Sequence, residues 1–274
     1  MGSGSMLPVD SAGRIMIKYH VINIGRFCPK IGSDIMFELK LEKNWYDAIH
    51  ARSSVRKYTA APDKEQLDRL GVLCRKLSWQ GVTIRMFKGP GLKPSNIKGT
   101  DVYAVIVAKH GTPMEVEGFM GEALVLEATA MGLGTCWLGA GFYADVISRN
   151  VNLQSDEAVH CVIALGKAAL PPFAPKRRNL QSVCGKTEQQ LGELGVWHKE
   201  AVDCARLAPS AVNLQPWKIE VDRAGLAILE RTTLVKKYAP IDRGICMLHA
   251  AVGAFHAGRE AVWKKVDGGY QMRA

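Results

Sequence analysis

The sequence predicts an α+β fold with two similar halves in one chain. Segments with helical periodicity alternate with short apolar segments that are typical of strands. The order helix, strand, strand, helix occurs twice, over residues 65–131 and again over residues 196–264. A chain of 274 residues with 47% hydrophobic content can bury a sizeable core, so one or two domains are expected.

Residues 36–185 form the first predicted half. Asp63 follows Pro62 and marks a helix start, because aspartate is a good N-cap and leucines follow it at helical spacing. The segment 101–108 is almost continuously apolar, which is typical of a central strand. The expected elements are helices at about 43–51, 65–77, 116–131 and 143–151, and strands at 82–87, 102–108, 135–138 and 159–166.

Residues 186–274 form the second predicted half. A helix at 196–207 leads into a loop at 208–216 that is rich in Pro, Ser, Asn and Gln. Strands at 217–221 and 226–229 and a helix at about 242–264 complete this half. Its element order matches residues 65–131, where only residues 78–81 join the first helix to the first strand. We interpret the match as a degenerate internal duplication.

The first 35 residues are predicted to precede the domain. Residues 1–6 resemble a tag remnant, and residues 7–35 form an N-terminal extension without clear periodicity. Within it, residues 15–17 and 21–24 are apolar enough for a short strand or hairpin. We therefore expect one domain over residues 36–274.

The charge balance favours an anionic partner of small size. The net charge is +10 and the pI is about 9.3, which fits an anionic cofactor, nucleic acid or acidic lipid. The basic residues are scattered apart from 176–178 and 236–237, and no aromatic residues are interleaved with them, so nucleic acid is not expected as a partner. No apolar run reaches 18 residues, so no membrane span is expected either.

The cysteines and histidines predict neither disulfides nor a metal site. The seven cysteines contain no CxxC pair and most lie in apolar surroundings, as in reduced, buried thiols of a cytoplasmic protein. No HExxH motif or Cys/His set occurs, and the chain has no Gly-x-Ser-x-Gly nucleophile elbow.

The stretch Arg52-Ser53-Ser54-Val55-Arg56 is a candidate anion cradle. If it is extended, Arg52, Ser54 and Arg56 lie on one face and present two cations and a hydroxyl. Taken alone, it is more typical of a solvated helix end, where basic residues are common.

Three further stretches carry recognisable patterns. Gly132 to Gly141 form a glycine-rich loop around a short strand, and Pro175-Lys176-Arg177-Arg178 form a basic connection. Pro209 to Trp217 read Pro-Ser-Ala-Val-Asn-Leu-Gln-Pro-Trp. The segment 139–144 also matches GxGxxA after a strand, but the next strand ends in Leu165-Gly166-Lys167 without a ribose-binding acid, so we reject a dinucleotide fold.

Together the four stretches resemble the FMN-dependent nitroreductase family. Residues 209–217 resemble its Pro-Ser-Ser-x-Asn-x-Gln-Pro-Trp signature, with Ala211 in place of the second serine. Residues 52–56 resemble its Arg-x-Ser-x-Lys/Arg motif, and residues 175–178 its Pro-Lys-x-Arg motif. Here the Pro-Ser loop follows the glycine-rich loop, which resembles the single-chain branch, the TM nitroreductase type, whose two halves imitate a dimer.

The resemblance implies a mostly antiparallel sheet packed between helices, and one FMN between the halves. Arg52, Lys176 and Arg178 would hold the phosphate, Ser54 the phosphate or ribityl chain, and Arg56 the pyrimidine edge. Gly139 and Ala140 would offer backbone N–H groups to flavin N5, and Pro209, Ser210 and Asn213 would contact the ring edge from the other half. Ser53, Trp137 and Leu138 complete the implied set of binding residues.

The implied reaction is ping-pong transfer of two electrons. NADH or NADPH would reduce the flavin, and a nitroaromatic, quinone or similar acceptor would reoxidise it, so no protein acid or base is required. Two other functions fit the same residues: a flavin enzyme of another reaction type, such as a dehalogenase or a flavin-consuming enzyme, and a flavin-binding redox sensor without turnover. A cytoplasmic monomer (a pseudo-dimer) or weak homodimer is expected.

Overall fold

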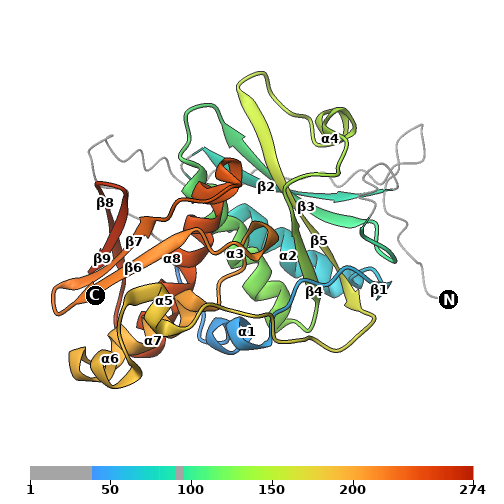
Figure 1. The fold of residues 1–274 in the computed structure, drawn as a ribbon. Coiled ribbons are helices and arrows are strands. Elements are labelled where there is room, and N and C mark those ends of the chain that lie inside the picture. The colour runs from blue at the N-terminus through green and yellow to red at the C-terminus, as the bar shows by residue number, and fades with distance from the viewer. Residues whose placement is uncertain (1–38, 80, 90–95, 274) are drawn as a thin grey trace, which may run out of the picture. The chain divides into compact units, whose positions relative to one another are not determined.

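The computed structural model describes residues 39–79, 81–89 and 96–273 (Figure 1). The predicted extension and its hairpin, residues 1–35, lie outside these ranges. The elements are α1 (Trp45–Ala51), β1 (Tyr58–Ala60), α2 (Lys64–Lys76), β2 (Val82–Lys88), β3 (Val102–Lys109), α3 (Met114–Ala130), β4 (Gly134–Leu138), α4 (Ala144–Asn150), β5 (Glu157–Ala168), α5 (Leu180–Cys184), α6 (Glu188–Leu194), α7 (Val196–Arg206), η1 (Ala211–Asn213), β6 (Trp217–Asp222), β7 (Gly225–Glu230), η2 (Lys236–Tyr238), α8 (Ala239–His256), β8 (Val262–Val266) and β9 (Gly269–Arg273).

Two sheets flank the long helices α3 and α8 (Figure 1). The first has the order β1-β5-β3-β2, with β4 also paired to β5, and the second has the order β6-β7-β9-β8. Every strand pair in both sheets is antiparallel. The predicted α+β class, with antiparallel strands and two halves, is confirmed, but the strands form two sheets rather than the single sheet that was predicted.

The core explains why the most apolar strand is central. β3 lies between β5 and β2 and is buried on both faces. Its residues Ala104 and Ile106 join the main core cluster, while Tyr103 and Val105 join a smaller cluster on the opposite face. The main cluster also holds residues of the second sheet, such as Ile219 and Ile228, so one core connects the two halves.

The predicted duplication is visible in the element order, since α2-β2-β3-α3 corresponds to α7-β6-β7-α8. One boundary was wrong: the helix predicted at 242–264 ends at His256, and residues 262–266 form strand β8. Gly258 takes a left-handed φ of 79° just beyond the helix, which stops it. Trp263 is then buried between exposed neighbours, as in a strand with one face on the core.

α3 and α8 cross at two glycines, one from each half. A Cβ on Gly118 would lie 2.0 Å from the backbone oxygen of Ile241, and a Cβ on Gly244 would lie 2.0 Å from that of Glu115. Each helix thus presents a glycine to a carbonyl of the other, as a pseudo-two-fold axis requires. Beside the crossing, Arg243 Nη2 donates to Glu115 Oε1 at 2.5 Å. The crossing fixes the start of α8 relative to the first half.

The helices within the described ranges are all too short or too polar to span a bilayer. The described cysteines, six in number, are free thiols, and five of them are buried. Burial raises the pKa of the Cys74 thiol to about 12.

Candidate functional site

The segment that follows α1 runs alongside β4. Ser54 forms a parallel bridge with Thr135, and the Val55 N–H donates to the Thr135 oxygen at 2.8 Å. Gly134 permits this approach, since a Cβ there would lie 2.9 Å from the Val55 side chain. Exposure does not alternate along the segment: Arg52 and Ser53 are buried, Ser54 is half-buried and Arg56 is exposed. Arg52 therefore points into the protein and Arg56 toward solvent.

Arg52, at the start of this segment, and Arg206 both lie near enough to Arg177 for their charges to act on it, and we call these three residues the arginine cluster. Burial lowers the pKa of Arg177 to about 10, and the charges of Arg52 and Arg206 lower it further against the opposing effect of Glu122. Burial also lowers the pKa of Arg52, which is only 6% exposed. Arg52 Nε and Arg206 Nε are buried without a hydrogen-bond partner in the described part of the chain. The cluster therefore has an excess of positive charge and unmet donors.

Glu122 of α3 is the carboxylate that faces this cluster. It is fully buried, and its Oε1 lies 3.9 Å from Arg52 Nε, too far for a hydrogen bond. Its Oε2 accepts from Trp137 Nε1 at 2.7 Å, so the same carboxylate fixes the indole of β4. Sequence patterns did not single out Glu122, because a lone acid inside an apolar helix carries no spacing signal.

His249 of α8 completes the environment of Glu122. Its Nε2 lies 2.9 Å from Glu122 Oε1, and its Nδ1 lies 3.1 Å from the Cys204 carbonyl oxygen. A carbonyl only accepts, so Nδ1 is the donor and a neutral ring has its lone pair on Nε2. The Glu122–His249 pair therefore shares one proton between its two facing atoms. Burial lowers the pKa of His249, while its hydrogen bond to Glu122 acts in the opposite direction.

The loop between α7 and β6 has an unusual backbone. Val212, Asn213 and Gln215 all have left-handed φ angles, of 43°, 59° and 50°. Such angles are uncommon outside glycine and disfavoured for a β-branched residue such as Val212. Hydrogen bonds hold the loop in this shape: Gln215 N–H donates to Ser210 Oγ at 2.8 Å, and the Asp242 carboxylate accepts from Ala211 N–H at 3.0 and 3.1 Å. Pro209 is buried beside it.

The basic connection 175–178 lies against this loop. Arg177 donates from Nε to the Leu207 oxygen at 3.1 Å and from Nη1 to Asn213 Oδ1 at 2.9 Å. Arg178 donates from Nη2 to the Leu214 oxygen at 3.1 Å, while its Nε is buried without a described partner. Lys176 is exposed, and its backbone oxygen accepts from Asn213 Nδ2. The predicted residues of both halves thus meet here, but Arg177, which the motif leaves as a variable position, is the member of the connection beside Arg52.

The glycine-rich loop after β4 meets the start of α8. The Tyr238 hydroxyl donates to the Gly139 oxygen, across 99 residues of sequence. A Cβ on Gly139 would lie 2.7 Å from Tyr238 Cζ, so a glycine is required for this contact. Leu138 is buried, while Ala140 is exposed beside it. Tyr238 was not predicted, since it stands in no motif.

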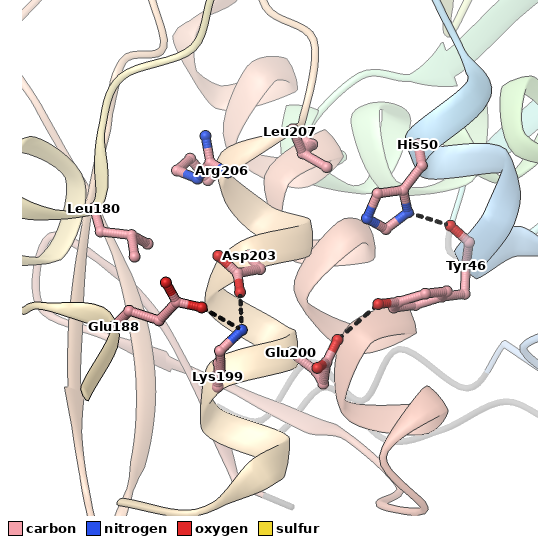
Figure 2. Close-up of a pocket in the computed structure, with 9 residues that line it drawn as sticks. All are labelled: Tyr46, His50, Leu180, Glu188, Lys199, Glu200, Asp203, Arg206 and Leu207. Carbon is pink, nitrogen blue, oxygen red and sulfur yellow. Dashed lines mark hydrogen bonds and ion pairs between the residues drawn. The ribbon is translucent and has the colours of Figure 1, made fainter. Parts of the chain in front are cut away.

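A cavity of about 440 Å³ lies between α1, α7 and the α5–α6 region (Figure 2). At one side Lys199 pairs with Glu188 and Asp203, and at the other the Tyr46 hydroxyl donates to Glu200. Arg206 and Leu207 lie at the end of α7 in the same view. Because Arg206 belongs to the arginine cluster and Arg177 bonds to Leu207, the cavity adjoins the cluster.

These features suit an anionic cofactor with a phosphate group. A phosphate offers several acceptor oxygens and about two negative charges, which match unmet guanidinium donors and excess positive charge. The orphaned Nε atoms of Arg52, Arg178 and Arg206 all belong to residues at the junction of the two halves. No group of three or more His, Cys, Asp or Glu residues in the described ranges has metal-binding geometry.

The chain resembles known proteins over most of its length. The family model described as "Putative TM nitroreductase" matches residues 44–254. A solved "putative nitroreductase" from Thermotoga maritima is 27% identical, with a TM-score of 0.63, and the match covers 88% of this chain and 98% of that one. No curated protein matches this chain.

More distant solved structures match about half of the chain. A nitroreductase family protein from Clostridium difficile is 18% identical, with a TM-score of 0.44, over 52% of this chain and 98% of that one. A nitroreductase with bound FMN from Desulfitobacterium hafniense is 16% identical, with a TM-score of 0.41, over 50% of this chain and 96% of that one.

Proposed function

Because this chain belongs to the TM nitroreductase family, we propose that it is an FMN-dependent oxidoreductase that passes two electrons from NADH or NADPH to a small electron-poor acceptor. The observation that carries the proposal is the arginine cluster: buried cations with unmet donors, placed where the family-like motifs of both halves meet. A nitroaromatic or a quinone is the expected acceptor class.

The arginine cluster would bind the phosphate. Arg52 and Arg206 have free donors there, and each charge-assisted hydrogen bond to a phosphate oxygen is worth about 1.5–3 kcal/mol. Ser53 and Ser54 lie on the same segment and would reach the phosphate or the ribityl chain. Lys176 and Arg178 would add positive charge nearby, and Arg177 joins them on the strength of its contact with the cluster.

The two loops would hold the isoalloxazine ring between them. Gly139 and Ala140, after Trp137 and Leu138, would direct backbone N–H groups to the reactive edge, with the loop held by Tyr238. Pro209, Ser210 and Asn213 would contact the ring from the second half. Arg56, exposed at the end of its segment, would neutralise negative charge on the pyrimidine edge and so favour the reduced cofactor.

The protein would supply binding and orientation rather than acid–base chemistry. When bound, FMN supplies the two-electron chemistry by accepting from a reduced nicotinamide and giving to the acceptor. Donor and acceptor would share one pocket in turn, which predicts ping-pong kinetics. We further propose a single domain over residues 36–274 that works in the cytoplasm as a monomeric pseudo-dimer or a weak homodimer.

The test begins with the purified protein and FMN. We expect a yellow protein, or one that regains flavin absorbance when FMN is added. We then expect parallel-line steady-state kinetics for NADH or NADPH oxidation with a nitroaromatic or quinone acceptor. A colourless protein that cannot be loaded with FMN would refute the proposal. A protein that binds FMN but shows no turnover with any acceptor would instead point to the redox sensor. A protein that consumes its flavin, or that removes halogen from a substrate, would point to the other enzyme classes.

A further inference from the structure

The first turn of α8 touches both loops that would enclose the flavin ring. Tyr238, at the N-cap, donates to the Gly139 oxygen of the first half. Asp242, one turn later, accepts from the Ala211 N–H of the second half. The two loops are far apart in sequence and come from different sheets, so this turn is where their positions relative to each other are set.

Asp242 holds the strained loop at its start. Both carboxylate oxygens accept from the same Ala211 N–H, and the side chain is 4% exposed. The left-handed residues Val212, Asn213 and Gln215 follow directly. A backbone in these conformations persists only where its surroundings fix it. The other bonds of the loop come from the 175–178 connection and from the loop itself, so Asp242 is its tie to the helix layer.

Asp242 is buried, and its ionisation changes the charge beside the loop amide that it holds. Burial raises the pKa of Asp242 to about 7, although the Ala211 hydrogen bond acts in the opposite direction. The groups that sense its charge are the buried thiols of Cys161 on β5 and Cys246 on α8. Lys237, ahead of the helix, and Glu117 of α3, which pairs with His160, also act on Cys161. No described cation forms an ion pair with Asp242, so its charge is offset chiefly by the loop amide.

We propose that Asp242 is a positioning residue for the cofactor: as a carboxylate it fixes the 210–215 loop against the flavin ring, and when protonated it releases the loop and weakens FMN binding. The inference rests on the proposed FMN site. A carboxylate accepts a stronger hydrogen bond from an amide than a neutral carboxyl does, so the loop is held more tightly above pH 7 than below it. Because burial raises the pKa of Asp242 from 3.8 to about 7, its ionisation costs folding stability, which is lost as the pH rises from about 4 to about 7.

The variant Asp242→Asn separates charge from shape. Asparagine keeps the size and an acceptor oxygen but has no charge at any pH, so it mimics the protonated acid. The measurement is the dissociation constant of FMN for both proteins at pH 8 and at pH 5.5. The phosphate of FMN ionises near pH 6, but this affects both proteins alike and cancels in their ratio.

We expect the variant to bind FMN about tenfold more weakly than the natural protein at pH 8, and equally well at pH 5.5. Asp145→Asn changes an exposed aspartate that pairs with Arg149, and it should leave the ratio of the two dissociation constants near one at both pH values. Tyr238→Phe removes the other contact of the same turn through a hydroxyl, and should weaken binding by the same factor at both. The proposal would be overturned if the dissociation constant of Asp242→Asn, divided by that of the natural protein, were the same at both pH values or were below one at pH 8.

A second measurement needs no cofactor. Hydrogen exchange at the Ala211 amide, compared between the natural protein and Asp242→Asn at the same pH, should be slower in the natural protein at pH 8 and equal at pH 5.5. Equal exchange at pH 8 would refute the role of Asp242 directly. If the natural protein bound no FMN while this exchange difference held, the proposed function would fail and the contact that positions the loop would stand.

Discussion

The two ends of the candidate site are built in opposite ways. At the arginine cluster, buried donors of Arg52 and Arg206 have no described partner. At the 209–216 loop, the polar groups are paired with one another and with Arg177, Arg178 and Asp242. One end has donors and charge to spare, and the other has a strained backbone held in a fixed shape.

This difference suggests that one end of the site supplies the affinity for a ligand and the other sets the ligand's position. Unmet donors cost free energy until a ligand satisfies them, so the arginine cluster is where a ligand would gain most of its binding energy. A loop that is already satisfied gains little from a ligand, but it orients whatever binds at the other end. Changes at the first end should therefore have the largest effects on affinity, and changes at the second should alter affinity, geometry or stability by smaller amounts.

The largest effect is expected from Arg52→Ala. Loss of a buried guanidinium at the phosphate should weaken FMN binding by about 2–4 kcal/mol, or at least thirtyfold. Riboflavin, which lacks the phosphate, should lose little affinity for the same variant. The measurement is the dissociation constant of each flavin by fluorescence quenching. Arg69→Ala, an arginine that is exposed and pairs with Glu127, is the matched control. Equal losses for FMN and riboflavin would place the phosphate elsewhere.

The helix crossing that brings the two ends together should be nearly as sensitive. Gly244→Ala puts a methyl group against the Glu115 backbone, and we expect a loss of about 2–3 kcal/mol in the free energy of unfolding. Denaturant unfolding of the cofactor-free protein measures it. Gly192→Ala on α6, where a Cβ meets nothing within 4 Å, should be neutral or slightly stabilising. Equal stability of the two variants would mean that the crossing adapts.

Much of the fold could be predicted because its signals are local. The expected N-cap at Asp63 is present, where it forms a capping box with Gln66, and the apolar run at 102–108 is the doubly buried strand β3. The end of α8 was misjudged because apolar periodicity continues through Ala261 and Val262, while the stop depends on one glycine. The short helices α5 and α6, of five and seven residues, were missed.

The candidate site was predictable only where motifs carry it. The segments at Arg52, Gly139 and Pro209 stand in recognisable spacing. In the structure the first runs beside β4, and the start of α8 contacts the loops of the other two. Glu122, Tyr238 and Asp242 act through contacts that cross between elements 31 to 127 residues apart, and no spacing rule encodes such pairs. Arg177 was not predicted because it stands at the variable position of the Pro-Lys-x-Arg motif. Its burial near Arg52 depends on how the connection is folded, which the motif does not show.

Comparison of neighbouring basic residues tests that distinction. We expect Arg177→Ala to weaken FMN binding about tenfold, because it removes a cluster cation and the Asn213 contact, and Lys176→Ala about threefold or less, because an exposed charge is screened. Arg177→Lys keeps the charge but loses the planar set of guanidinium donors, and its loss of FMN affinity should lie between those of Arg177→Ala and Lys176→Ala. The dissociation constant of FMN at fixed ionic strength decides the order. The reverse order would restore Lys176 as the principal ligand.

The smallest effect concerns the strained loop itself. Val212 has a φ of 43° and is 80% exposed, so its side chain contributes strain and little packing. Val212→Gly removes that strain but adds flexibility to the unfolded chain, and we expect a net gain below about 1 kcal/mol in the free energy of unfolding. FMN affinity should stay unchanged, because the hydrogen bonds that set the loop use other residues. Val262→Gly, half-exposed in β8 with ordinary strand geometry, should instead lose stability. If Val212→Gly lost stability or FMN affinity, the Val212 side chain would contribute to packing or to flavin binding, contrary to this expectation.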